Sequence, residues 1–370
     1  MPQGMLGTIR EELRHSPLLW LLLSVPALFV LEHEAPGAHT ALFVVSVLAI
    51  VPLASLLSRA TESVAARTGD AVGGLLNATL GNLTELVIAL TALRAGMFDL
   101  VKASIAGAIV TNSLFMLGLA LLLGGLRHHT QEYNRATARL QVGMLFLAAV
   151  ALLVPSVIAA NDRPGAMDLV ADLSLGLSML LLGAYVLGLV FSLKTHRAFF
   201  ASAGGEGHDE PVWPIGTALS LLGVVTVMVA LVSEVFVESV QQAAVTFGMT
   251  PAFVGFIVVS LVGAAAEMTA AFSAARRGRL DLSIGIALGS SAQIALFVAP
   301  VLVLASYFIA PTPMTLHFWP GAVAIVLIST MAVSFVATSG RSAWFTGVQL
   351  LVIYLTFAMT LYLIPPQVAD

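Results

Sequence analysis

Long apolar stretches alternate along the chain with short polar stretches, and this pattern predicts membrane-spanning helices. A helix needs about 20 mainly apolar residues to cross the hydrocarbon core of a bilayer. Most charged and turn-forming residues lie between the apolar stretches. We therefore expect an all-α polytopic membrane protein with about eleven transmembrane helices, at residues 17–31, 39–58, 71–94, 99–126, 137–158, 170–194, 214–238, 250–276, 281–307, 315–338 and 343–365.

Composition supports this interpretation and excludes several function classes. Of the 370 residues 59% are hydrophobic and 10% charged, with a mean hydropathy of +0.99. Soluble domains have about 25% charged residues. The chain has no cysteine, which rules out disulfides and cysteine metal sites. It also lacks a phosphate-cradling G-x-x-x-x-G-K-[S/T] loop, which argues against an ATP-driven pump, and its net charge of −4 gives no basic footprint for nucleic acid.

The first apolar run, residues 17–31, is short and follows Arg10 and Arg14. It fits either a signal peptide cleaved within HEAPGAHTA or a retained first helix, and we favour the retained helix. Both alternatives place the N-terminus inside the cell.

Positive charges are distributed unequally between the two sides of this layout. Thirteen Lys and Arg residues fall on the side of the N-terminus, whereas the opposite side has Arg94, Lys102 and Arg163. Short cytoplasmic loops carry the excess of positive charge in membrane proteins. We expect a cytoplasmic N-terminus, an outside C-terminus and an odd number of spans, in a prokaryotic inner (plasma) membrane.

The sequence contains an internal repeat. A shift of 182 residues aligns GNLTELVIALTALRAGMFDLVKASIAG (81–107) with GAAAEMTAAFSAARRGRLDLSIGIALG (263–289), and nine of the 27 positions are identical. The identities include Glu85 with Glu267, Gly81 with Gly263, and an Arg-x-Gly-x-x-Asp turn. Composition alone would match alanines and leucines, but not a carboxylate within an apolar helix.

The offset moves Glu85 by five spans, so the two copies enter the membrane from opposite sides. Inverted repeats with polar residues near the bilayer centre are typical of secondary transporters. We predict an N-terminal segment with the first helix at 1–38, a first five-helix repeat at 39–194, a cytoplasmic linker at 195–213, and a second inverted repeat at 214–370.

Glu85 and Glu267 are the strongest candidates for function. A carboxylate at membrane depth costs about 3 kcal/mol on insertion scales. The pseudo-twofold axis would bring both to one place near the midplane, where two close carboxylates cannot both be charged without a partner. Either protons or a divalent cation must neutralise them, and competition between the two is itself an exchange mechanism.

Hard cations such as Ca²⁺ take six to eight oxygen ligands. Amides and hydroxyls near the two carboxylates offer such oxygens, although interhelical hydrogen bonding or close packing would also explain them: Asn77, Asn82, Thr84, Asn112, Ser113, Ser290, Ser291 and Gln293. No His or Cys lies on these helices, which disfavours zinc or copper. Near the membrane faces, Glu62, Glu234 and Glu238 could collect cations or be plain interfacial charges. The EGHDE segment (206–210) fits a soluble linker better than a Ca²⁺ or pH sensor.

The two repeat cores resemble the signature regions of the calcium/proton exchanger (CAX) family, in the calcium/cation antiporter superfamily. The first comprises GGLLNATLGNLTELVIAL and ASIAGAIVTNSLFMLGLALLLGGL (103–126), and the second comprises residues 253–304. The resemblance implies eleven helices and Ca²⁺ extrusion driven by an inward proton gradient. It also implies that Glu85 and Glu267 alternately bind protons and cation, flanked by Asn82, Asn112, Ser290, Ser291 and Gln293.

The second signature departs from the family pattern Gly-Asn-Ala-Ala-Glu-His. Ala264 removes an amide ligand and Met268 removes a titratable neighbour. We expect a cation/proton antiporter, most readily for Ca²⁺ as transported substrate and without a cofactor. Na⁺, K⁺ or another divalent ion stays open as the cargo. An intramembrane hydrolase would leave the inverted repeat unexplained, and a channel would leave the carboxylate pair unexplained. Whether the protein forms a homo-oligomer stays open.

Overall fold

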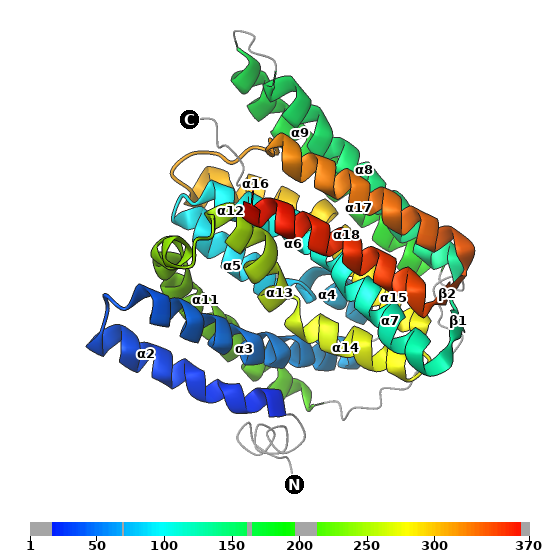
Figure 1. The fold of residues 1–370 in the computed structure, drawn as a ribbon, viewed down its shortest axis with the longest axis horizontal. Helices are drawn as coiled ribbons and strands as arrows, with labels where there is room; N and C mark the ends of the chain where they lie inside the picture. The colour runs from blue at the N-terminus through cyan, green and yellow to red at the C-terminus, as the bar shows by residue number, and fades with distance from the viewer. Residues whose placement is uncertain (1–16, 69, 161–164, 197–212, 364–370) are drawn as a thin grey trace.

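The computed structural model describes residues 17–68, 70–160, 165–196 and 213–363, so the predicted patch at 206–210 and most of the linker lie outside the described residues. The chain forms a bundle of helices with one two-stranded ribbon (Figure 1). Five segments are 3-10 (η1) or π-helical (η2–η5). The elements are η1 (Pro17–Leu23), α2 (Ser24–Glu34), α3 (His39–Arg67), α4 (Asp70–Leu80), α5 (Leu83–Arg94), α6 (Phe98–Val110), η2 (Thr111–Met116), α7 (Leu117–His128), β1 (Thr130–Glu132), α8 (Arg135–Ala159), α9 (Ala166–Val190), η3 (Phe191–Thr195), α11 (Ile215–Thr246), α12 (Pro251–Phe253), η4 (Val254–Val259), α13 (Ser260–Gly263), α14 (Ala265–Arg276), α15 (Leu280–Gln293), η5 (Ile294–Val298), α16 (Ala299–Ile309), α17 (Pro320–Ser339), β2 (Arg341–Ala343) and α18 (Trp344–Leu363).

The described residues contain eight helices long and apolar enough to cross a membrane, or up to ten if two bent pairs each count as one span. This confirms the all-helical membrane class. The first apolar run forms η1 and α2, which are too short to enter this count separately. Helix α3 continues to Arg67, so residues 59–67, predicted to connect two spans, are helical.

Two predicted helices are broken near their middle. The stretch 71–94 divides into α4 and α5, bent by 42°, and the stretch 250–276 bends by 61° between α13 and α14. The sequence prediction of continuous helices was wrong here. Gly81 lies in the first break, and Gly263 is the last residue of α13, directly before the second break at Ala264. Glycine weakens a helix by only about 1 kcal/mol, so tertiary packing decides the local conformation.

The internal repeat is visible in the structure. The breaks at Gly81 and Gly263 are 182 residues apart, and the π-helical segments η2 and η5 overlap after the same shift. The Ser291 hydroxyl donates to the carbonyl oxygen of Ile109 at 3.2 Å, and these residues are also 182 apart. Contact between equivalent positions is what a twofold axis between two copies produces.

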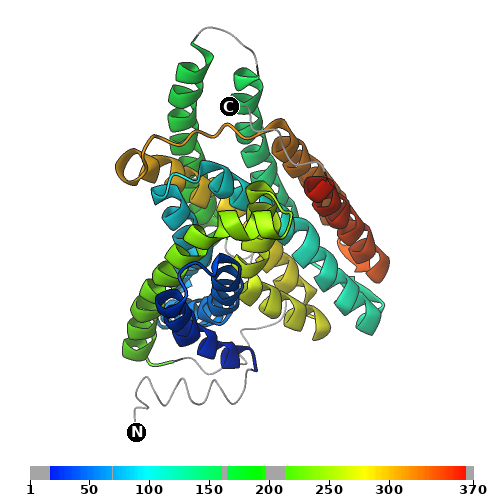
Figure 2. The same cartoon turned by 60° about the vertical axis from the view of Figure 1, so that its left-hand side comes forward.

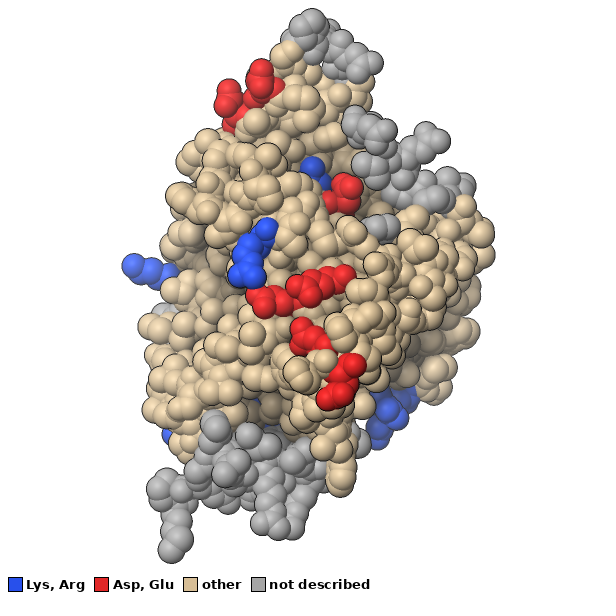
Figure 3. Space-filling model, turned by 90° about the vertical axis from the view of Figure 1, so that its left-hand side faces the viewer, with Lys and Arg blue, Asp and Glu red and all other residues tan. Residues whose placement is uncertain are grey.

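The helices differ in how deeply they are buried. The segment that runs from α6 to α7 is 83% buried, whereas the most apolar windows of α9 and α18 are each 22% buried. In Figure 2, α9 (green) and α18 (red) lie on opposite sides of the helices between them. Figure 3 looks at the left-hand side of Figure 1, where several helices end, and groups of acidic and basic side chains lie across this face.

Candidate functional site

Both carboxylates lie in the first turn of a helix that starts after a break. Glu85 lies in α5 and Glu267 in α14. A helix N-terminus carries partial positive charge, which favours a carboxylate there. Glu85 is 9% exposed and Glu267 is half-buried. The breaks therefore turn two helix N-termini, each with a carboxylate, into the protein interior.

The two carboxylates lie near each other. The Glu85 side chain rests on Gly263, where an added Cβ would lie 2.8 Å from Glu85 Cγ and 3.2 Å from its Oε1. Glu267, one turn beyond Gly263, interacts electrostatically with Glu85. Glycine at 263 is thus required by the close approach of Glu85, and the fold joins residues that are 182 positions apart.

Several buried polar atoms at and around this site have no hydrogen-bond partner. Buried polar groups in proteins are normally paired, so such a group points to a ligand or proton. Within the described residues, no group of three or more His, Cys, Asp and Glu lies close enough together to hold a metal ion. The atoms without partners are Glu85 Oε1, Glu267 Oε2, Asn82 Oδ1, Asn112 Nδ2 and Oδ1, Gln141 Oε1 and Thr61 Oγ1.

Two predicted polar positions support these groups directly. The Asn82 amide nitrogen donates to Gln293 Oε1 at 2.6 Å, which joins the first break to the end of α15. This bond fixes the Asn82 amide and leaves its Oδ1 available. Ser290, also on α15, hydrogen-bonds Glu267. Helix α15 therefore bonds Asn82 at the first break through Gln293, and it bonds Glu267 through Ser290.

Other predicted ligands have different contacts. Ser291 donates to the carbonyls of Ile109 and Ala287, and Ser113 donates to Val110 at 3.4 Å, so both hydroxyls are used in helix packing. Thr84 is buried beside Glu85, whereas Asn77 is exposed one turn before the break.

The acidic residues predicted near the membrane faces divide into two groups. Glu62 on α3 accepts a hydrogen bond from Ser58 at 3.2 Å and interacts electrostatically with Glu267. Glu234 instead pairs with Arg94 at 2.6 Å, and Glu238 is exposed on the same helix, α11. Of the three, Glu62 is the one that the structure connects to the carboxylate pair.

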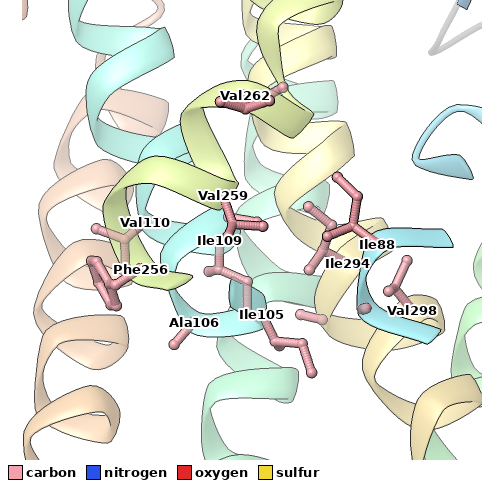
Figure 4. Close-up of a cluster of buried hydrophobic side chains, with 14 of the residues drawn as sticks. Ile88, Ile105, Ala106, Ile109, Val110, Phe256, Val259, Val262, Ile294 and Val298 are labelled. Atoms are coloured by element: carbon pink, nitrogen blue, oxygen red, sulfur yellow. The ribbon is translucent and has the colours of Figure 1, made fainter. Parts of the chain in front are cut away.

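One side of Glu85 is closed by apolar side chains. A cavity of about 10 Å³, roughly the volume that one water occupies, lies beside Glu85 and is bordered by Ser104, Ser260, Ile105 and Val298. Figure 4 shows the surrounding apolar side chains, contributed by helices of both repeats. Glu85 therefore borders a small cavity whose lining is mostly apolar.

The second break lacks an amide, as its sequence indicates. Ala264 and Met268 are buried. Thr111, which the repeat aligns with Gln293, bonds the Ser260 hydroxyl at 3.0 Å instead. Sequence reasoning missed Gln141 on α8, whose Nε2 donates to Gly285 at 3.2 Å while its Oε1 has no partner. A polar amide within the apolar stretch 137–158 was the available signal.

Comparison with known proteins identifies the family. A family model described as sodium/calcium exchanger protein matches residues 38–194 and 217–363. The chain belongs to this family. The two matched stretches contain both carboxylates and both helix breaks, and family membership makes this exchanger a transport protein, not an enzyme.

Named relatives are similar over nearly the whole length. A Ca²⁺/H⁺ antiporter of Synechocystis sp. is 37% identical over 95% of this chain and 98% of its own. The Ca²⁺/H⁺ antiporter ChaA of Bacillus subtilis is 39% identical over 87% of this chain and 92% of its own. The structure of native YfkE superposes with a TM-score of 0.80 at 34% identity, covering 94% of this chain and 100% of that one.

More distant structures share the fold. The H⁺/Ca²⁺ exchanger CAX superposes with a TM-score of 0.72 at 17% identity, over 95% of this chain and 88% of that one. These similarities confirm the predicted resemblance and the all-α membrane fold.

Proposed function

We propose that this exchanger moves Ca²⁺ against protons at a site formed by Glu85 and Glu267. The observation that carries the proposal is the meeting of two carboxyl groups at equivalent helix breaks, one buried and one half-buried, each with a buried oxygen that has no hydrogen-bond partner. The similarity to proteins named Ca²⁺/H⁺ antiporters supports the choice of ions.

Electrostatics supplies the coupling. Two neighbouring carboxylates away from water repel each other, so the pair needs either protons or a divalent cation. Both neutralised forms can move between the two faces of the membrane at low cost, whereas the empty dianion cannot. Cation and protons therefore exchange one for the other instead of leaking separately.

The ligand set suits Ca²⁺ and leaves its selectivity as the point to test. Glu85, Glu267, Asn82 and Asn112 offer carboxylate and amide oxygens, the ligands that hard cations prefer. Ala264 removes the amide that the second break would otherwise contribute. With this amide absent, Na⁺, K⁺ or another divalent cation is the alternative cargo.

We further propose a cytoplasmic N-terminus, a plasma-membrane location in a prokaryote, and two inverted units at 39–194 and 214–370 joined by residues 195–213. The charge asymmetry supports the orientation. The two separate family matches, at 38–194 and 217–363, support the division into units. Similarity to antiporters from Synechocystis sp. and Bacillus subtilis supports the location.

The test uses everted membrane vesicles or proteoliposomes with an imposed pH gradient. We expect the gradient to drive ⁴⁵Ca²⁺ uptake, and Glu85→Gln or Glu267→Gln to abolish it. Glu132→Gln is the matched control, because Glu132 pairs with Arg341 on the exposed β1–β2 ribbon. Ca²⁺ uptake that does not depend on the pH gradient would contradict antiport. If the gradient drives uptake of Na⁺ or K⁺ but not of Ca²⁺, that ion is the cargo of the same mechanism.

A further inference from the structure

Two tyrosines are buried on helices whose side chains are mostly not buried. Helices α9 and α18 flank the bundle (Figure 2), and only 22% of the most apolar window of each helix is buried. Tyr185 on α9 is 6% exposed and Tyr354 on α18 is 3% exposed. Both side chains reach inward from lipid-facing helices to the elements that carry the site.

The two rings make matching contacts. Tyr185 stacks on Phe297 with ring centroids 5.4 Å apart, and Tyr354 packs on Phe115 with centroids 5.1 Å apart. Phe115 and Phe297 are 182 residues apart, so the internal repeat makes them equivalent. They lie in the π-helical segments η2 and η5, and π-helical turns within α-helices are frequent at functional sites.

The Tyr185 hydroxyl contacts the first broken helix directly, and the Tyr354 hydroxyl is connected to the second through one side chain. The Tyr185 hydroxyl donates to the carbonyl of Ala78 at 2.6 Å. The Tyr354 hydroxyl lies 3.3 Å from Thr111 Oγ1, which lies 3.0 Å from the Ser260 hydroxyl. Ala78 and Ser260 are 182 residues apart, each three residues before the glycine of its break.

Helix geometry explains why a hydroxyl is useful at the first break. The last four carbonyls of a helix have no partner within the helix, and Ala78 is among them because α4 ends at Leu80. The Tyr185 hydroxyl satisfies the carbonyl that the break leaves unpaired. At the second break Thr111 passes the contact to Ser260, so the same connection is made through one more side chain.

We propose that Tyr185 and Tyr354 are a matched pair of positioning residues whose hydroxyls hold α9 and α18 on the two helix breaks, so that each break moves together with its flanking helix. The proposal rests on the proposed exchange function only for its effect on rate. Alternating access moves the helices of one repeat relative to the other. Without the hydroxyl, the break no longer follows its flanking helix, and exchange slows while the ligands stay in place.

The first experiment is independent of transport. Amide hydrogen exchange is measured on the full chain in lipid nanodiscs, for Tyr185→Phe and Tyr354→Phe, which both retain the ring. We expect Tyr185→Phe to increase exchange about five-fold in residues 77–83 but not in 259–265, and Tyr354→Phe to do the reverse. Equal acceleration at both breaks in each variant, or no acceleration at either, overturns the proposal.

The second experiment measures pH-driven Ca²⁺ uptake by the same variants. We expect the maximal rate to fall about five-fold while the KM for Ca²⁺ stays within about two-fold. Tyr362→Phe is the control, because Tyr362 lies on α18 with an exposed side chain. A maximal rate at or above the wild-type value overturns the role in exchange. If the wild type itself moves no Ca²⁺, the proposed function fails while hydrogen exchange still tests the contacts.

Thr111→Val, which keeps the shape of the side chain, is the second variant for both experiments if Tyr354→Phe does not fold.

Discussion

At the scale of single residues, the two carboxylates differ in their surroundings. Glu85 lies against Gly263 beside a small cavity and apolar packing, whereas Glu267 is half-buried and interacts with Ser290 and Glu62. Glu267 is therefore the more approachable of the two. Glu62 is the acidic residue near a membrane face whose charge acts on Glu267, so we expect it to influence how cations approach the pair.

A prediction for Glu62 follows from its position. We expect the Glu62 carboxylate to raise the local cation concentration near the pair without being a ligand itself, and salt screens such an effect. We expect Glu62→Gln to raise the KM for Ca²⁺ about three-fold at low ionic strength and to leave the maximal rate nearly unchanged. Glu238→Gln, with an exposed side chain on α11, is the control. An unchanged KM at low salt would show that cations approach by another path.

His317, between α16 and α17, gives a pH prediction. Burial, and secondly the positive charge of Lys102, lower the pKa of His317 below its ordinary value. The unfolded chain therefore takes up the proton at a higher pH than the folded chain does, and stability declines as the pH falls through about 6.5. We expect His317→Gln to flatten the decline in thermal unfolding temperature between about pH 7.5 and 5.5. An equally steep decline in the variant would show that titratable groups other than His317 cause the pH dependence of the unfolding temperature.

At the scale of elements, the two helix breaks build the site. Each break turns a new helix N-terminus inward and puts a carboxylate in its first turn. The sequence shows the glycines and the repeat but not the breaks, because Gly81 and Gly263 shift helix stability by only about 1 kcal/mol each and tertiary contacts decide. The π-helical segments and the tyrosine contacts are equally invisible in hydropathy, since they depend on which helices become neighbours.

Gly263→Ala tests the close approach at the second break. The new methyl group would lie 2.8 Å from Glu85 Cγ, so the Glu85 side chain must move. We expect the KM for Ca²⁺ to rise about ten-fold or more while the protein still folds, because overpacking costs about 1–3 kcal/mol. Gly285→Ala is the control, since nothing lies within 4 Å of its added Cβ. Wild-type uptake by Gly263→Ala would remove Gly263 from the account of the site.

At the scale of the whole molecule, the sequence predicts the helical membrane class, the duplication and the residues that meet. The strongest evidence in the sequence is that the repeat aligns Glu85 with Glu267. A carboxylate within the membrane is costly, so its presence in both copies indicates a function. Gln141 was missed, since a single amide on an unrelated helix has no counterpart in the repeat. The sequence also cannot show that Ser291 and Ser113 bond backbone carbonyls, because a hydroxyl in a helix can bond either its own backbone or an ion.

We propose that Ca²⁺ and protons compete for one carboxylate pair, Glu85 and Glu267. Calorimetric titration of the purified protein with Ca²⁺ at about pH 7, in buffers of different ionisation enthalpy, counts the protons released on binding. The account predicts release of about one to two protons per Ca²⁺. It also predicts loss of both binding and release in Glu85→Gln and Glu267→Gln, with neither lost in Glu132→Gln. Ca²⁺ binding to the wild type without proton release would contradict it.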